Sequence, residues 1–144
     1  MAYFPVFIDI KNMNVLVIGL GSIAARRIKI LSDFGAEITV ITKEVKADIK
    51  DINIKIKEFS ENDIQEMYDM VIAATDDDEL NKKIAAVSKS KGIRYYNNAG
   101  CKEDNNFYFP AVIENDDIIC GLISKNGLNH KAAKYYADKL RDIL

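Results

Sequence analysis

The chain has 144 residues, of which 49% are hydrophobic and 29% are charged, and its formal net charge at pH 7 is −2. This balance is that of an ordinary globular protein, which excludes a disordered chain, a collagen-like chain and a small disulfide scaffold. The lack of a basic field argues against a nucleic-acid partner. Because no apolar run reaches the ~20 residues of a membrane span and no signal peptide is recognisable, we expect a cytoplasmic protein with no membrane contact.

Strand-like and helix-like segments alternate over most of the chain. In order, we predict strands over 4–10 and 14–18, a helix over 23–34, a strand over 37–42, an edge strand over 52–56, a short helix over 60–67, a buried strand over 70–74, a helix capped by Thr75 or Asp76, and a strand over 93–97. This alternation predicts an α/β fold with a parallel sheet and right-handed crossovers.

After residue 97 the pattern changes to that of a hairpin and a helix. We predict a polar loop over 98–106, strands over 107–113 and 118–124, and a final helix over 130–144. The chain therefore divides into a first domain at 1–110 and an appendage at 111–144. A lone hairpin is marginal in water, so we expect the appendage to cover its apolar surface by forming a homodimer.

The strongest local motif is Gly19-x-Gly21-x-x-Ala24, which lies between a predicted strand and a predicted helix. In this context Gly19 permits a tight turn, Gly21 leaves room for a pyrophosphate, and Ala24 lets the helix pack close to the sheet. The N–H groups that begin the helix then face the pyrophosphate. The motif predicts a Rossmann-type dinucleotide-binding domain.

The ribose of such a cofactor meets the end of the strand over 37–42. An acidic residue there binds the ribose of NAD, and Glu44 can take that part, whereas Lys43 can tolerate the 2′-phosphate of NADP. The residues alone leave this choice open. Thr75 follows the buried strand over 70–74 and is expected to border the cofactor, because ligands bind at the carboxyl ends of the strands.

Other polar residues carry weaker signals. The acids at 76–78 are typical of a solvated first helical turn, so we predict no metal site. His130 is the only histidine and begins a predicted helix, which favours a surface or capping role over catalysis. Cys101 and Cys120 have no metal-type spacing and are predicted to be reduced thiols.

Four stretches together are similar to one enzyme family. They are the aromatic start at 3–7, the glycine turn with its basic continuation at 17–27, the alanine-threonine-acidic stretch at 72–81 and the aromatic-proline stretch at 107–111. In this order they resemble the precorrin-2 dehydrogenase / sirohydrochlorin ferrochelatase family, which includes the amino-terminal part of siroheme synthase.

The resemblance implies a Rossmann domain, a dimerisation segment, and NAD-dependent removal of two hydrogens from precorrin-2 to give sirohydrochlorin. It places cofactor contacts at Ser22, Ile23, Lys43 and Glu44, with Thr75 nearby. Some members also insert ferrous iron. The tetrapyrrole substrate that the resemblance implies carries many carboxylates. The basic residues near the end of the chain are then expected to bind them.

Three departures from the family pattern bear on activity. Gly100 stands where the family commonly has an acid/base aspartate, and Asp104 is the acid that we predict to have taken this role. Asn129-His130 replaces a serine-proline pair, and many relatives continue beyond the equivalent of Leu144. The alternatives are a catalytically silent NAD- or tetrapyrrole-binding module and an iron chelatase, although the single histidine and the missing aspartate argue against the chelatase.

Overall fold

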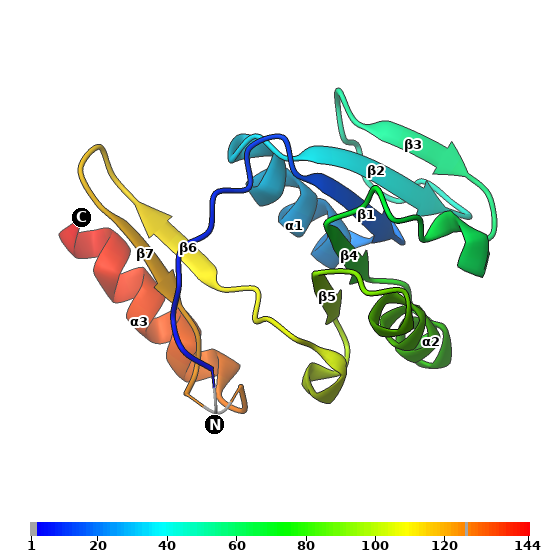
Figure 1. Ribbon diagram of the computed structural model, residues 1–144. Coiled ribbons are helices and arrows are strands. Elements are labelled where there is room, and N and C mark those ends of the chain that lie inside the picture. The colour runs from blue at the N-terminus through cyan, green and yellow to red at the C-terminus, as the bar shows by residue number, and fades with distance from the viewer. Residues whose placement is uncertain (1–2, 126) are drawn as a thin grey trace. The chain divides into compact units, whose positions relative to one another are not determined.

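A five-stranded parallel sheet is the centre of the fold. The computed structural model describes residues 3–125 and 127–144. The strands of the sheet are β1 (Asn14–Ile18), β2 (Glu37–Thr42), β3 (Asn53–Ile56), β4 (Met70–Ala73) and β5 (Tyr95–Asn98). They lie in the order β3-β2-β1-β4-β5 (Figure 1). The order reverses between β1 and β4, and ligands of open α/β sheets bind at the carboxyl ends of the strands beside such a switch point.

Two helices cover the sheet. They are α1 (Ser22–Asp33), between β1 and β2, and α2 (Asp78–Ser90), between β4 and β5. The crossover from β1 to β2 and the crossover from β4 to β5 run in opposite directions along the sheet. Because crossovers between parallel strands are right-handed, the two helices cover opposite faces. Helix α1 buries Ala24 and Ile28. Helix α2 packs Ile84 into a cluster with Leu16. The Rossmann-type α/β fold is confirmed.

The exposed edge of β5 is closed by asparagine side chains rather than by another strand. The Asn106 side chain accepts from the N–H of Tyr96 at 2.9 Å and donates to the carbonyl of Arg94 at 2.8 Å. The Asn105 side chain bonds the N–H and the carbonyl of Asn98 in the same manner. These two amides satisfy backbone groups that would otherwise face water. At the opposite edge lies β3, the predicted edge strand. It is more exposed than its alternating sequence predicts, because Ile56 is 68% exposed.

The described residues form two compact units, one of residues 6–107 and one of residues 3–5 with 108–144. The second unit holds an antiparallel hairpin of β6 (Ala111–Glu114) and β7 (Ile119–Leu122), together with α3 (His130–Ile143). Its first residues join it through Tyr3, whose ring packs edge-on against that of Tyr108 at a centroid distance of 4.4 Å. No helix among the described residues is long and apolar enough to cross a bilayer.

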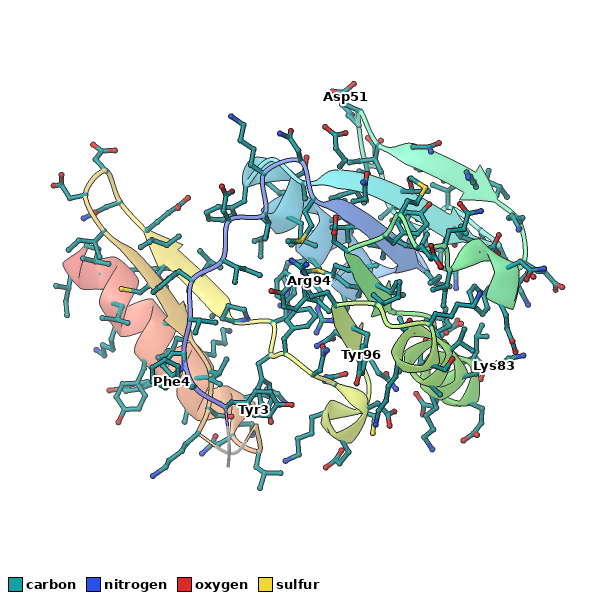
Figure 2. The ribbon with its side chains drawn as sticks, viewed as in Figure 1. Tyr3, Phe4, Asp51, Lys83, Arg94 and Tyr96 are labelled. Atoms are coloured by element: carbon teal, nitrogen blue, oxygen red, sulfur yellow. The ribbon has the colours of Figure 1, made fainter. Side chains whose placement is uncertain are left out.

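Some predicted elements are wrong or misplaced. Residues 4–10 form no strand. Phe4, labelled in Figure 2, is 82% exposed. The predicted helix over 60–67 is only the 3-10 turn η1 (Glu61–Asp63), closed by a capping box with Ser60. Helix α2 is capped by Asp77, whose side chain accepts from the N–H of Leu80, and not by Thr75 or Asp76.

Candidate cofactor site

The turn between β1 and α1 requires glycine at position 19. Gly19 has φ of +100°, and a Cβ there would lie 2.7 Å from the carbonyl carbon of Ala74. The N–H of Gly19 donates to the carbonyl of Ile41 at 2.8 Å, which ties the turn to β2. The tight turn therefore depends on both the left-handed backbone and the close approach of β4.

Gly21 meets a different requirement. It is the N-cap residue of α1 with φ of −93°, an ordinary value, and a Cβ added there would have nothing within 4 Å. No side chain caps α1, and its first turn holds no acid. The first N–H groups of a helix have no partner within the helix, and its dipole favours an anion at this end. The open space beside Gly21 thus fits the pyrophosphate of a dinucleotide.

A cavity of about 500 Å³ lies over this turn, at the carboxyl ends of β1, β2 and β4. All the predicted cofactor residues except one line it: Gly19, Gly21, Ser22, Ile23, Lys43, Glu44 and Thr75. The exception is Ala24, which is fully buried. Its small side chain lies inside the first turn of α1, in the packing position that the motif assigns to it.

Two ion pairs involve residues that line the cavity at the ends of β2 and β4. The Nζ of Lys46 lies 3.3 Å from Oδ2 of Asp76, and the Nζ of Lys43 lies 3.3 Å from Oε1 of Glu58. The hydrogen bond from Lys46 holds the pKa of Asp76 below its usual value. Among the described residues, no ion pair involves the carboxylate of Glu44. Glu44 is therefore an acid at the end of β2 that remains available to a ribose hydroxyl.

Asn81 positions Thr75 and was missed by the sequence analysis. Its Oδ1 accepts from the N–H of Thr75 at 3.0 Å and from Oγ1 of Thr75 at 2.7 Å, and its Nδ2 donates to the carbonyl of Thr75 at 3.0 Å. Asn81 is only 2% exposed. A polar residue on the buried face of an otherwise amphipathic helix was the signal that could have found it.

Arg27 is a second polar residue that the sequence analysis did not single out. Its Nη1 donates to Oδ1 of Asn97 on β5 at 2.6 Å, and Nδ2 of Asn97 donates to the carbonyl of Phe107 at 3.0 Å. Burial, assisted by the charge of Arg26, lowers the pKa of Arg27 to about 10, so the guanidinium stays protonated at neutral pH. This chain of hydrogen bonds connects α1 to the last residue of the first unit.

Asp104, the predicted acid/base residue, lies in the 3-10 turn η2 (Lys102–Asp104) that follows β5. Its Oδ2 accepts from Nδ2 of Asn98 at 2.9 Å, and Oδ1 of Asn98 accepts from the N–H of Gly100 at 2.9 Å. Asn98 is 2% exposed and therefore holds a fixed orientation. Asp104 is oriented at the carboxyl end of β5, two strands from the glycine turn on β1.

The remaining candidates lie outside the lining of this cavity. Cys101 and Cys120 are free thiols, as predicted. His130 is exposed at the start of α3, which is capped by Asn129. Within residues 3–125 and 127–144, no group of three or more His, Cys, Asp or Glu side chains could hold a metal ion.

The glycine turn, the uncapped helix and the cavity beside the switch point define a dinucleotide-binding Rossmann domain. Residues 6–111 match the family described as "Putative NAD(P)-binding". The solved structure of SirC, a precorrin-2 dehydrogenase, superposes with a TM-score of 0.82 at 30% identity, covering 99% of this chain and 71% of that one. The chain belongs to this NAD(P)-binding family, in the branch that contains SirC and the amino-terminal part of siroheme synthase.

The chain also matches part of several longer proteins. The chain is 42% identical over 146 residues to the "Probable multifunctional siroheme biosynthesis protein HemA" of Ruminiclostridium josui, covering 97% of this chain and 28% of that protein. It is 33% identical to the siroheme synthase of Mannheimia succiniciproducens, covering 100% of this chain and 31% of that protein. The chain thus spans less than one third of these two relatives.

Proposed function

We propose that the chain catalyses the NAD-dependent dehydrogenation of precorrin-2 to sirohydrochlorin in siroheme biosynthesis. The observation that carries this proposal is the uncapped, acid-free N-terminus of α1, which opens beside Gly21 into the cavity at the switch point. SirC, which superposes on 99% of the chain, supports the choice of substrate.

The residues of the first unit bind and orient the cofactor. The N–H groups that begin α1 hold the pyrophosphate, and Glu44 at the end of β2 accepts from a ribose hydroxyl, which favours NAD over NADP. Asn81 fixes Thr75 as the wall of the cavity on the β4 side. When bound, the nicotinamide supplies hydride acceptance, which no side chain can provide.

A carboxylate near the end of β5 completes the chemistry. Dehydrogenation releases a proton as well as a hydride, and we assign Asp104, whose carboxylate accepts a hydrogen bond from Asn98, as the acceptor of that proton. A positioned acid or base contributes ~100- to 10,000-fold in rate. The substrate also carries many carboxylates, and the second unit has basic side chains at Lys125, Lys131, Lys134 and Lys139.

We also infer that the second unit forms a homodimer. Its exposed apolar side chains include Ile118 at 49%, Ile119 at 41% and Ile143 at 79% exposure. Tyr135 and Tyr136 on α3 are exposed as well. A second copy of the chain would cover these residues by burying the same surface on both partners.

The deciding experiment incubates the purified chain with precorrin-2 and NAD and follows the absorbance of sirohydrochlorin and of NADH together. Equal formation of both products supports the dehydrogenase. The second candidate is an NAD- or tetrapyrrole-binding module, which Gly100 favours because it brings no acid to its position. Binding of NAD and precorrin-2 without turnover would support this module and contradict the enzyme.

A further inference from the structure

Thr42, the last residue of β2, is buried, and its hydroxyl bonds the main chain of the loop that follows. Its Oγ1 donates to the carbonyl of Glu44 at 2.7 Å and accepts from the N–H of Glu44 at 3.4 Å. Thr42 is 7% exposed and lines the cofactor cavity. Its own main chain is fixed in the sheet, because its carbonyl accepts from the N–H of Lys57 at 2.9 Å. The hydroxyl is therefore a rigid point to which Glu44 is tied.

Glu44 has few other attachments. It is exposed and belongs to a loop over residues 43–52 that contains no helix or strand. Among the described residues, the main chain of Glu44 is hydrogen-bonded to Thr42 alone. The ion pairs of Lys43 and Lys46 on either side are exposed, and exposed ion pairs contribute little stability. The place of Glu44 at the end of β2 thus depends on the Thr42 hydroxyl.

The lysines of the cavity make the place of Glu44 decisive for the choice of cofactor. Three lysines from the segments that follow β2 and β3 line the cavity: Lys43, Lys46 and Lys57. Lysine is a common ligand of phosphate, so these residues favour the 2′-phosphate of NADP. The carboxylate of Glu44 opposes them, because it repels a phosphate and accepts a hydrogen bond from the 2′-hydroxyl of NAD. A displacement of this one carboxylate therefore changes which cofactor binds better.

We propose that Thr42 is a positioning residue that sets the preference for NAD over NADP, by holding Glu44 at the 2′-hydroxyl of the ribose. This inference rests on the cofactor site of the proposed function. Valine at position 42 would put a methyl group where the hydroxyl stands. A methyl group donates no hydrogen bond, and it packs at about 3.5 Å or more rather than at the 2.7 Å that separates Oγ1 from the carbonyl of Glu44. The loop that carries Glu44 would therefore move away from the strand end.

The test measures the affinities for NAD and for NADP by calorimetric titration and takes their ratio as the readout. We expect Thr42→Val to lower the preference for NAD by about tenfold, because NAD loses a hydrogen-bond acceptor and NADP loses a repelling charge. Thr42→Ser keeps the hydroxyl and should retain most of the parent ratio. Thr39→Val makes the same substitution on β2 at a residue outside the lining of the cavity, so it should leave the ratio unchanged.

A second comparison shows whether Thr42 acts through Glu44. Glu44→Gln should lower the ratio by itself, because the amide carries no charge. Adding Thr42→Val to Glu44→Gln should then change the ratio by less than about twofold, since the carboxylate whose place matters is already gone. A further tenfold loss in the double variant would overturn the proposal. Thr42→Ala gives the same comparisons if Thr42→Val does not fold.

The outcomes separate this inference from the proposed function. Equal losses of affinity for NAD and NADP in Thr42→Val would show a structural effect alone and overturn the role of Thr42. An unchanged ratio would overturn it too, as would a parent that binds NADP as tightly as NAD. The dehydrogenase is decided separately, by the turnover of precorrin-2 with NAD. A parent that binds neither dinucleotide would overturn the proposed function and this inference together.

Discussion

Two glycines in one turn have unrelated physical reasons. Gly19 is required by its backbone, because φ is +100° and β4 leaves no room for a Cβ. Gly21 has an ordinary φ and open space where a Cβ would lie. A side chain at position 19 should therefore destabilise the fold, whereas a side chain at position 21 should block the ligand from its place beside the helix.

The first prediction follows from this contrast. Gly21→Val should fold normally and weaken NAD binding by tenfold or more, because the side chain fills the space that a pyrophosphate needs. Gly19→Ala should lower the free energy of unfolding by about 1–3 kcal/mol, because it forces a strained backbone conformation. Calorimetric titration with NAD and urea unfolding measure the two effects. Equal NAD affinity in Gly21→Val and the parent would refute the cofactor site at this turn.

The second prediction concerns Asn81. Asn81→Ala removes three hydrogen bonds to Thr75, so the free energy of unfolding should fall by about 2–3 kcal/mol and NAD binding should weaken. Asn81→Asp keeps an acceptor for two of the three bonds and should bind NAD more tightly than Asn81→Ala. Urea unfolding and calorimetry give both values. A fully stable Asn81→Ala would mean that the Thr75 loop is held by other contacts.

The third prediction concerns Asp104. Asp104→Asn removes the carboxylate but keeps a similar shape and an acceptor for the amide of Asn98. Turnover of precorrin-2 at saturating NAD should fall by at least tenfold, with NAD affinity unchanged, because a proton acceptor is lost rather than a cofactor contact. Glu103→Gln in the same turn is the control. Parent-like turnover in Asp104→Asn would remove Asp104 from the mechanism.

At the scale of elements, sequence patterns predict those strands and helices whose character depends on their own residues. The strands at 14–18 and 37–42 agree with β1 and β2 because continuous β-branched or aliphatic runs are typical of buried parallel strands. The segment at 4–10 has the same character but no neighbouring strand pairs with it, and strand propensity alone cannot supply a partner.

The candidate site, like the fold, could be predicted from the sequence only in part. The glycine turn, Lys43, Glu44 and Thr75 could be placed, because the motif and the strand ends fix which residues meet at one edge of a sheet. The hydrogen bonds of Asn81 and the contact between Arg27 and Asn97 could not, because side-chain partners far apart in sequence depend on tertiary packing.

At the scale of the whole molecule, the prediction is a dimer formed through the second unit. Ile119→Lys on β7 should convert a dimer to a monomer at micromolar concentration, because it places a charge in a buried apolar surface. Ile56→Lys on the edge strand β3 is the matched control, since Ile56 is 68% exposed in the other unit. Sedimentation velocity measures both. A monomeric parent would contradict the dimer, as would a dimeric Ile119→Lys.

The asparagines along β5 also bear on how the chain behaves while it is being made. A free strand edge is a template on which another chain can add and begin an aggregate. Asn105 and Asn106 already occupy the backbone groups of β5, so this edge offers an incoming strand few partners. The other edge carries Lys55 on β3, and a charged side chain repels an added strand. We therefore expect both edges of the sheet to resist the addition of another strand, the β5 edge because of its amides and the β3 edge because of its charge.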